Sequence, residues 1–526
     1  MSKPKFNISG PCTPGKHYML DPLRGIGDEL MNLIDEEEYF VIHAARQSGK
    51  TTLLWELVDK INTKGDYYAL YCTLEAVENF TEPERGIPEI INRITDSIER
   101  QGFSEGFAKN ANYNNLSGVL NRALVNYCRA LDKPLVIFFD EADCLSNGTL
   151  ITFLRQLREG YVCRGREPFV HSIALVGMRN IRDYRAHIRP DTETLGSSSP
   201  FNIMKESFNL RNFTEEEVAE LYQQHTTETG QTFDPQAVEH VFEQTQGQPW
   251  LVNAIACECV EKITKKDYTI PITENLAKQA IRNIVLKWGT HFDSLMERLK
   301  EQRVRNIIVP LLTGDEVVDK FTNDYQYTRD LGLIREIDID GRVEPGNPIY
   351  AELIVRTLNW NVQDSIRNTH KEYDLPRYLK NGKIDMDYLI KDFQVYWREN
   401  SEIWKGRYKK DFYEYDEAAA HLVLQAFLQR VVNGGAQVLR EFALGTRQAD
   451  LCVVYNAQKY PIELKIQQNE KGRAESLKQI SDYAEKVGSD VGWLVIFDRS
   501  PKKLWGKKIY MKKETVNGKK ITVAGC

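Results

Sequence analysis

The chain has 526 residues, of which 42% are hydrophobic and 27% charged. This length exceeds what one hydrophobic core supports, so we expect three or four domains of ordinary globular composition. The net charge of −6 excludes a chain that is basic throughout, so any nucleic-acid contact needs a local basic surface.

No apolar run reaches the roughly 20 residues that span a bilayer, and residues 1–10 lack the apolar stretch of a signal peptide. The nine cysteines include no C-x-x-C pair, and Cys257 and Cys259 form only an isolated C-x-C. We therefore predict a cytoplasmic protein with reduced thiols, no structural zinc and no membrane partner.

Residues 1–205 alternate short apolar strands with helical stretches, which is typical of a mostly parallel sheet wrapped by helices. The pattern predicts a multidomain α/β fold that begins with this unit. The clearest strands are expected at Tyr39–His43, Tyr68–Thr73, Leu135–Phe139 and Ser172–Val176.

A phosphate-binding loop (P-loop) is predicted directly after the first of these strands. In such a loop, backbone N–H groups surround phosphate oxygens, a lysine reaches the β- and γ-phosphates, and a hydroxyl holds Mg²⁺. Thr51 supplies the hydroxyl, and Ala44 replaces the usual glycine, which is tolerated if its φ is negative. The predicted ATP-binding residues are Arg46, Gln47, Ser48, Gly49, Lys50, Thr51 and Thr52.

A second match to the same spacing, Gly10–Lys16, is rejected as a phosphate-binding loop. His17 replaces the hydroxyl, no strand precedes the segment, and Pro11 and Pro14 lack N–H groups.

The buried strand ending at Phe139 is followed by two acids, Asp140 and Glu141. We predict that Asp140 holds the Mg²⁺ ion and that Glu141 polarises the attacking water. The simpler alternative is a helix N-terminus, where the helix dipole stabilises acidic side chains.

Four stretches resemble the signal-transduction and archaeal-type branch of AAA-related ATPases: Ala45–Leu54, Leu135–Asp143, Ala174–Asp183 and Thr245–Ala254. The resemblance implies a polar γ-phosphate sensor at Arg179 or Asn180, and a Gly247–Gln248–Pro249 turn in a small helical lid. A solvated arginine and a simple turn are the alternatives. The sequence leaves open a homo-oligomer in which Arg182 or Arg185 reaches a neighbouring subunit's nucleotide.

Two modules follow the first unit. Residues 206–275 are predicted as the helical lid, in which Thr214 is a candidate N-cap with Glu217 placed for a capping box. Residues 276–360 resemble a winged helix, with a candidate groove-reading helix at Asn323–Leu331 and a two-stranded wing that turns at Asp340–Gly341. A simple domain connector explains the latter segment equally well.

After a predicted linker at residues 361–385, a further α/β unit occupies residues 386–526. Asp450 lies in one predicted strand and Glu463–Leu464–Lys465 in the next. A turn of two or of four residues between them would put the three polar side chains on one sheet face. Asp450 and Glu463 could then share a divalent ion, Mg²⁺ or Mn²⁺, and Lys465 could orient its water.

This pattern resembles the PD-(D/E)XK nuclease family from about Asp392 onward. The resemblance implies a nearby helix that adds a glutamine and a tyrosine, matched by Gln479 and Tyr483. It also implies an acid on the first helix, for which Glu417 is the candidate. Glu441, on the preceding predicted strand, is the alternative.

The arrangement predicts an ATP-binding and ATP-hydrolysing protein coupled to metal-dependent cleavage of nucleic acid, with DNA the favoured partner. Defence or mobile-element biology is a role by analogy alone. The alternative is a nucleotide-switched module whose nuclease-like domain only binds DNA or protein. Eight lysines between Lys502 and Lys520 could follow phosphates or simply protect a hairpin edge.

Overall fold

In the computed structural model the chain divides into two compact units, Met1–Leu295 with Asp319–Ala351, and Met296–Val318 with Glu352–Cys526. The structure describes residues 3–103, 106–108, 113, 116–178, 203–287, 292, 297–313, 320, 322–337, 343–358, 375–399, 423–425, 427–428, 431, 437–443, 448–466, 470–498 and 503–526.

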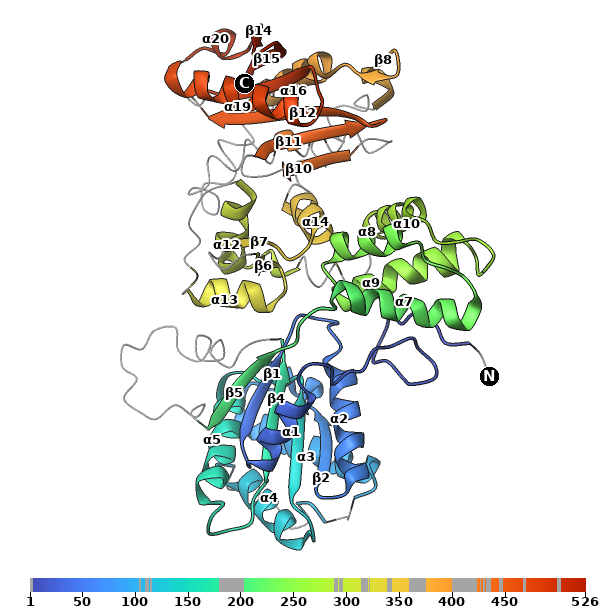
Figure 1. Cartoon of the computed structure of the whole chain (residues 1–526). Coiled ribbons are helices and arrows are strands. Elements are labelled where there is room, and N and C mark those ends of the chain that lie inside the picture. Colours follow the sequence, from blue (N-terminus) through green and yellow to red (C-terminus); the bar gives the residue numbers. More distant parts are fainter. Residues whose placement is uncertain are drawn as a thin grey trace. The chain divides into compact units, whose positions relative to one another are not determined.

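A five-stranded parallel sheet in the order β2-β3-β4-β1-β5 forms the centre of the first unit (Figure 1). The four predicted strands are confirmed to within one residue. The fifth was not predicted because its side chains are mostly exposed and polar. The strands are β1 Tyr39–His43, β2 Tyr68–Thr73, β3 Leu135–Asp140, β4 Ser172–Gly177 and β5 Met204–Asn209.

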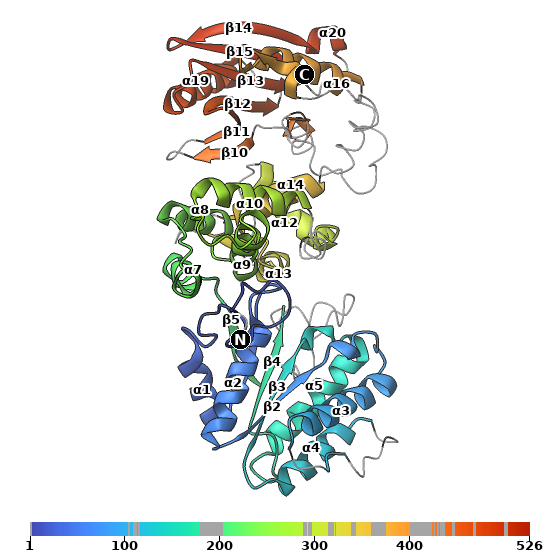
Figure 2. The same ribbon diagram turned by 90° about the vertical axis from the view of Figure 1, so that its right-hand side faces the viewer.

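Helices cover both faces of this sheet, with α1 and α2 on one side and α3, α4 and α5 on the other (Figure 2). Alternate residues of β1 enter the two cores: Phe40 and Ile42 pack with α1 and α2, and Tyr39 and Val41 pack on the opposite face. Burial on both faces explains the continuous apolar runs of these strands. The helices are α1 Gly27–Asp35, α2 Lys50–Lys64, α3 Pro83–Arg100, α4 Val119–Ala130 and α5 Asn147–Cys163.

The lid segment is helical, as predicted. Thr214 caps its first helix, because its hydroxyl accepts from the Glu217 N–H at 3.2 Å and the Glu217 carboxylate accepts from the Thr214 N–H at 2.9 Å. This confirms the capping box. The helices are α7 Glu215–Thr229, α8 Pro235–Thr245, α9 Pro249–Cys257 and α10 Glu274–Lys287.

The predicted winged-helix segment contributes to both units. Its second helix and its hairpin belong to the first unit, and its first helix belongs to the second. The predicted turn at Asp340–Gly341 lies outside the described residues. The elements are α12 Gln302–Thr313, α13 Asn323–Asp330, β6 Ile334–Glu336, β7 Val343–Pro345 and α14 Pro348–Leu358.

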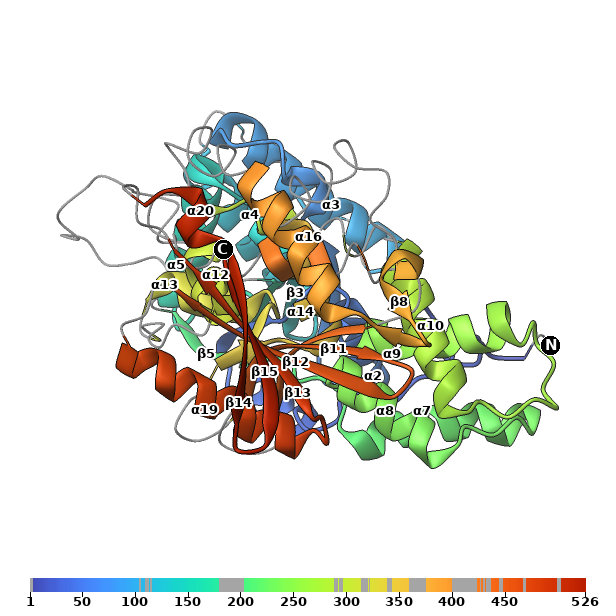
Figure 3. The same cartoon turned by 90° about the horizontal axis from the view of Figure 1, so that it is seen from above.

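A six-stranded mixed sheet in the order β10-β11-β12-β13-β15-β14 forms the second unit's centre. Helix α16 (Met386–Glu399) packs on one face and α19 (Glu470–Lys486) on the other (Figure 3). The strands are β10 Gln437–Ala443, β11 Gln448–Tyr455, β12 Gln458–Ile466, β13 Val491–Phe497, β14 Tyr510–Val516 and β15 Lys519–Gly525.

The end of the predicted linker forms secondary structure and belongs to the second unit's core. Residues 375–384 form a 3₁₀ turn and a short hairpin, and Leu375, Tyr378 and Ile384 are buried in the core that α16 covers. Charged residues between these apolar side chains obscured their burial in the sequence.

The nine cysteines, all within the described residues, are free thiols. None of the helices in the described part of the chain has the length and apolar character to cross a membrane.

Candidate functional site

The predicted P-loop joins the carboxyl end of β1 to α2. Its turn depends on two residues with positive φ, Gln47 at 58° and Gly49 at 95°. Ala44 is not among the positive-φ residues, so alanine fits where glycine is usual.

Lys50 lies inside this loop. It is 7% exposed, and its Nζ donates to the carbonyl oxygens of Ala44 at 2.9 Å and Ala45 at 3.0 Å. Burial lowers the pKa of Lys50, and the charge of Glu141 acts against that effect. The ammonium group is therefore held where phosphate oxygens could replace the two carbonyl acceptors.

Thr51 and Asp140 meet beside this lysine. Thr51 Oγ1 donates to Asp140 Oδ2 at 2.9 Å, and Asp140 Oδ1 accepts from the Glu141 N–H at 3.0 Å. Asp140 is 2% exposed at the end of β3. A hydroxyl and a carboxylate are the oxygen donors that Mg²⁺ prefers, so these residues fit a nucleotide-bound Mg²⁺.

Glu141 follows with a left-handed backbone, at φ 55°. Such strain in a non-glycine residue is concentrated at functional positions. Burial and the neighbouring Asp143 raise the pKa of Glu141 to about 7. A carboxylate that titrates near neutral pH is suited to accept a proton from water.

Tyr71 in β2 belongs to the same cluster and was missed from the sequence. Its hydroxyl donates to Asp140 Oδ2 at 3.0 Å, the oxygen that Thr51 also contacts. A tyrosine in an apolar strand normally indicates core packing, so the sequence carried no signal for this contact.

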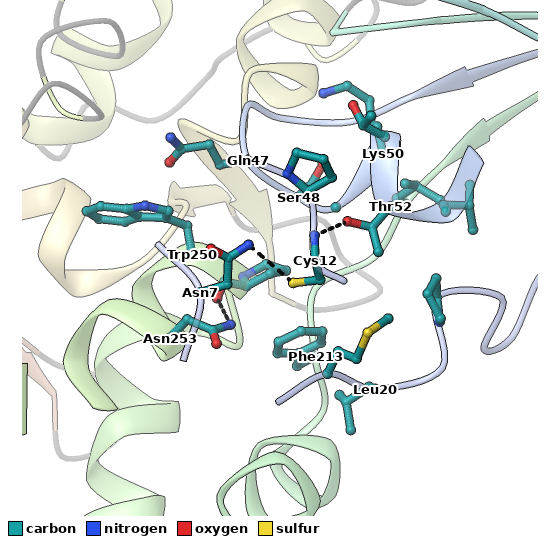
Figure 4. Close-up of a pocket in the computed structure, with 18 of the residues that line it drawn as sticks. Asn7, Cys12, Leu20, Gln47, Ser48, Lys50, Thr52, Phe213, Trp250 and Asn253 are labelled. Carbon is teal, nitrogen blue, oxygen red and sulfur yellow. Dashed lines mark hydrogen bonds between the residues drawn. The ribbon is translucent and has the colours of Figure 1, made fainter. Parts of the chain in front are cut away.

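A cavity of about 300 Å³ adjoins the P-loop (Figure 4). Its walls include the loop itself, the N-terminal segment around Asn7–Cys12, and Trp250 and Asn253 of α9. Asn253 is buried, and its Oδ1 has no hydrogen-bond partner among the residues that the structure describes.

The N-terminal wall contains the rejected Gly10–Lys16 match. The backbone N–H of Cys12 donates to Thr52 Oγ1 at 3.0 Å (Figure 4), and Trp250 Nε1 donates to the carbonyl of Ile8 at 2.9 Å. The segment therefore joins α2 to the lid, a role that the sequence did not indicate.

The predicted lid turn, Gly247–Gln248–Pro249, begins at a φ of 69°, and Gln246 just before it has a φ of 49°. A Cβ on Gly247 would lie 1.9 Å from the carbonyl oxygen of Phe213, so the position requires glycine. Gln248 then caps α9 by accepting from the Leu251 N–H at 2.6 Å. The turn therefore has little space for larger side chains. That it couples γ-phosphate sensing to movement of the lid remains a prediction.

The segment after the lid contacts the end of β1 and the start of the P-loop. Asp330 Oδ1 lies 3.4 Å from His43 Nε2, with both side chains buried, and a Cβ on Gly332 would lie 2.9 Å from the Ala45 Cβ. Tyr325 and Tyr327 of the candidate groove-reading helix are fully buried. Their burial supports the connector alternative, because buried side chains cannot contact base edges.

In the second unit, the register settles how Asp450 and Glu463 pair. Tyr455 pairs with Gln458 across a two-residue turn, and Leu451 pairs with Ile462. Continuing this antiparallel register by one residue places Asp450 opposite Glu463. This is the two-residue alternative of the sequence prediction.

Asp450, Glu463 and Lys465 form one cluster, here called the acid–lysine cluster. Asp450 Oδ2 accepts from the backbone N–H of Leu464 at 2.6 Å, and Lys465 Nζ lies 2.9 Å from Glu463 Oε1. The Leu464 side chain packs in the α16 core, so by strand alternation the cluster occupies the α19 face.

Glu463 is 2% exposed, and burial together with the charge of Asp450 raises its pKa to about 7. Lys465 opposes this rise, and the charges of Glu463 and Asp450 raise the pKa of Lys465. Among the described residues, Lys465 is the one cation in an ion pair with this pair of carboxylates, so the donor set fits a further, divalent ion.

Of the other predicted nuclease residues, the structure describes the side chains of Gln479 and Tyr483. Gln479 is half-buried on α19, and Tyr483 is buried one turn later. Glu441 lies in β10, but its side chain is outside the described part, as are Glu417 and the sensor candidates Arg179 and Asn180.

Among the described residues, no group of three or more His, Cys, Asp or Glu side chains is arranged to hold a metal ion. Mg²⁺ usually keeps several waters and takes one or two carboxylates together with phosphate oxygens, so two protein ligands at each candidate site are compatible with it.

A parallel sheet with a P-loop after β1 and an acidic pair after β3 defines the class of P-loop ATPases. The chain belongs to the family of AAA-like domains, whose model matches residues 29–351. A second family model, a domain of unknown function (DUF8371), matches residues 386–500. No curated protein matches the chain.

Among solved structures, a Walker-type ATPase of Pyrococcus abyssi is 15% identical, with a TM-score of 0.45 over 66% of this chain and 99% of that one. The Holliday junction branch migration motor RuvB of Thermotoga maritima is 12% identical, with a TM-score of 0.32 over 61% and 90%. The Orc1 protein of Aeropyrum pernix, solved with DNA, is 13% identical, with a TM-score of 0.34 over 66% and 95%. Similarity at this level carries no inference about activity.

Proposed function

We propose that the chain is an ATPase whose second unit is a metal-dependent nuclease, with DNA as the favoured substrate. The acid–lysine cluster carries the nuclease part of this proposal. The β11–β12 register, continued by one residue, supports a position of Asp450 opposite Glu463, and the lysine lies 2.9 Å from Glu463.

At the P-loop, the backbone N–H groups of residues 46–52 and the Lys50 ammonium would bind the phosphates. Thr51 and Asp140 would hold Mg²⁺, which neutralises charge on the β- and γ-phosphates. Glu141 would accept a proton from the attacking water while the γ-phosphorus–oxygen bond to ADP breaks. The cavity beside the N-terminal segment would accommodate the nucleoside.

At the acid–lysine cluster, Asp450 and Glu463 would hold Mg²⁺ or Mn²⁺, which lowers the pKa of a bound water and offsets the charge of the phosphorane. Lys465 would orient the attacking water or neutralise the developing charge. Attack forms one phosphorus–oxygen bond and breaks another, and the leaving oxygen takes a proton from solvent. Gln479 would contact the substrate from α19.

Nucleotide state would control access to this second site. Because Lys50 is far from the acid–lysine cluster in the sequence and lies in the other unit, a Lys50→Ala variant separates the two activities. A coupled protein would change its cleavage rate with this variant, and two independent domains would not.

The test is incubation of the full chain with plasmid, linear duplex and single-stranded DNA, and with RNA, in Mg²⁺ or Mn²⁺, with and without ATP. Asp450→Ala and Lys465→Ala should abolish cleavage but spare ATP binding, whereas Lys478→Ala on the exposed face of α19 should cleave normally. Equal cleavage by wild type and the cluster variants would reject the nuclease. Salt-sensitive DNA binding without cleavage would leave the nucleotide-switched binding protein as the function.

A further inference from the structure

We propose that Tyr71 is a positioning residue of the Mg²⁺–nucleotide site, which it serves through Asp140. The proposal rests on ATP binding at the P-loop. Asp140 Oδ2 accepts two hydroxyl hydrogen bonds, from Thr51 at 2.9 Å and from Tyr71 at 3.0 Å.

The backbone of Tyr71 is held from outside the sheet. β2 is an edge strand of the sheet, and the Gln101 side chain bonds its free edge at Tyr71. Gln101 Oε1 accepts from the Tyr71 N–H at 3.1 Å, and Gln101 Nε2 donates to the Tyr71 carbonyl at 2.8 Å. The rings of Trp55 on α2 and Tyr71 are nearly perpendicular, with a centroid distance of 6.2 Å. These contacts fix both the strand and the ring that present the hydroxyl.

The contacts to Asp140 leave its carboxylate little freedom to rotate. One oxygen accepts the two hydroxyls, and the other accepts the Glu141 N–H at 3.0 Å. A tyrosine hydroxyl keeps its proton at neutral pH, so Tyr71 remains the donor in this contact. The Tyr71 hydroxyl therefore stabilises the buried negative charge of Asp140 by a hydrogen bond and does not need to bind the metal ion itself.

Mg²⁺ demands near-ideal geometry from its oxygen ligands. Removal of the Tyr71 hydroxyl would free one side of Asp140, so the metal-dependent part of nucleotide affinity should fall. Loss of an outer-shell partner typically costs about 10–100-fold in metal affinity or activity. Affinity measured without the metal should not change.

The chain supplies a matched control on the same strand. Tyr68 Oη donates to Asp132 Oδ1 at 2.8 Å, and this exposed pair does not include Asp140 or Thr51. Tyr68→Phe therefore removes the same atom and the same type of hydrogen bond away from the nucleotide site.

The experiment measures binding of a fluorescent methylanthraniloyl-ADP to the full chain, in Mg²⁺ and in EDTA. Tyr71→Phe should weaken binding about tenfold or more in Mg²⁺ and leave binding in EDTA unchanged. Tyr68→Phe should match wild type in both. Tyr71→Phe keeps the ring and its contact with Trp55, and equal melting temperatures of the two variants would verify that the fold is retained.

Three outcomes would count against the role of Tyr71: wild-type affinity in Mg²⁺, an equal loss in Mg²⁺ and EDTA, or an equal loss in Tyr68→Phe. The last two would indicate a general structural effect. Failure of wild type to bind the nucleotide under either condition would instead refute the proposed ATP site.

Discussion

Replacement of Glu463 by glutamine should change how the stability of the second unit depends on pH. Glutamine keeps the size of the side chain and one acceptor oxygen but cannot ionise. Because the folded chain raises the pKa of Glu463 from 4.5 to about 7, ionisation of this buried group opposes folding.

The magnitude follows from that difference. Between pH 4.5 and about 7, the unfolded chain has released the Glu463 proton and the folded chain retains it, so stability falls as the pH rises. At about 1.4 kcal/mol per pH unit, the full loss above pH 7 is about 3 kcal/mol. Glu463→Gln should lack this contribution, and its stability relative to wild type should therefore improve with rising pH.

Hydrogen exchange of peptides from β12 and β13, measured in EDTA, would report this local stability. At each pH, comparison with wild type cancels the intrinsic exchange rate. The ratio of protection factors, wild type over Glu463→Gln, should fall by about 100-fold between pH 4 and pH 8. Glu475→Gln, at an exposed position of α19, is the matched control and should show a constant ratio.

Addition of Mn²⁺ at pH 8 should restore protection in wild type but not in Glu463→Gln, because the ion needs the ionised carboxylate. A pH-independent ratio for Glu463→Gln would refute the reasoning, since it would mean that Glu463 ionises as easily in the folded chain as in the unfolded chain.

Three further predictions concern the first unit. Glu141→Gln should reduce phosphate release about 10²–10⁴-fold at unchanged nucleotide affinity, because the base is lost and the phosphate contacts remain. Gly247→Ala should lower the thermal stability of the lid by about 1–3 kcal/mol or more in calorimetry, since its Cβ would overlap the Phe213 carbonyl. Asp330→Ala should cost about 1–3 kcal/mol and speed proteolysis of the first unit, because buried His43 loses a contact. Variants as stable as wild type would refute the last two.

Much of the first unit could be predicted because its signals are local. Apolar runs define β1 to β4, and the P-loop and acidic pair occupy fixed places at the ends of β1 and β3. The Thr214 capping box was equally accessible, since it depends on residues three apart. β5 was missed because an edge strand with exposed polar residues has no apolar run.

What the sequence could not supply were contacts between distant segments. Tyr71 approaches Asp140 only because β2 and β3 are neighbours in the sheet, and the N-terminal segment reaches the lid only through tertiary packing. In the second unit, alternation limited the acid–lysine cluster to two registers. The φ angles of Asn456 (47°) and Ala457 (62°) accompany the two-residue turn that selects one of them.

The contacts of His43 in β1 with Asp330, and of Ala45 in the P-loop with Gly332, have a consequence for biosynthesis. β1 and its loop leave the ribosome long before their downstream partners, so His43 and Ala45 stay uncovered until residues 319–351 have been translated. Nascent-chain folding of the nucleotide site should therefore finish late. A truncated chain that stops after the lid would keep every predicted ATP-binding residue. Its His43 and Ala45 would nevertheless lack the contacts made by Asp330 and Gly332.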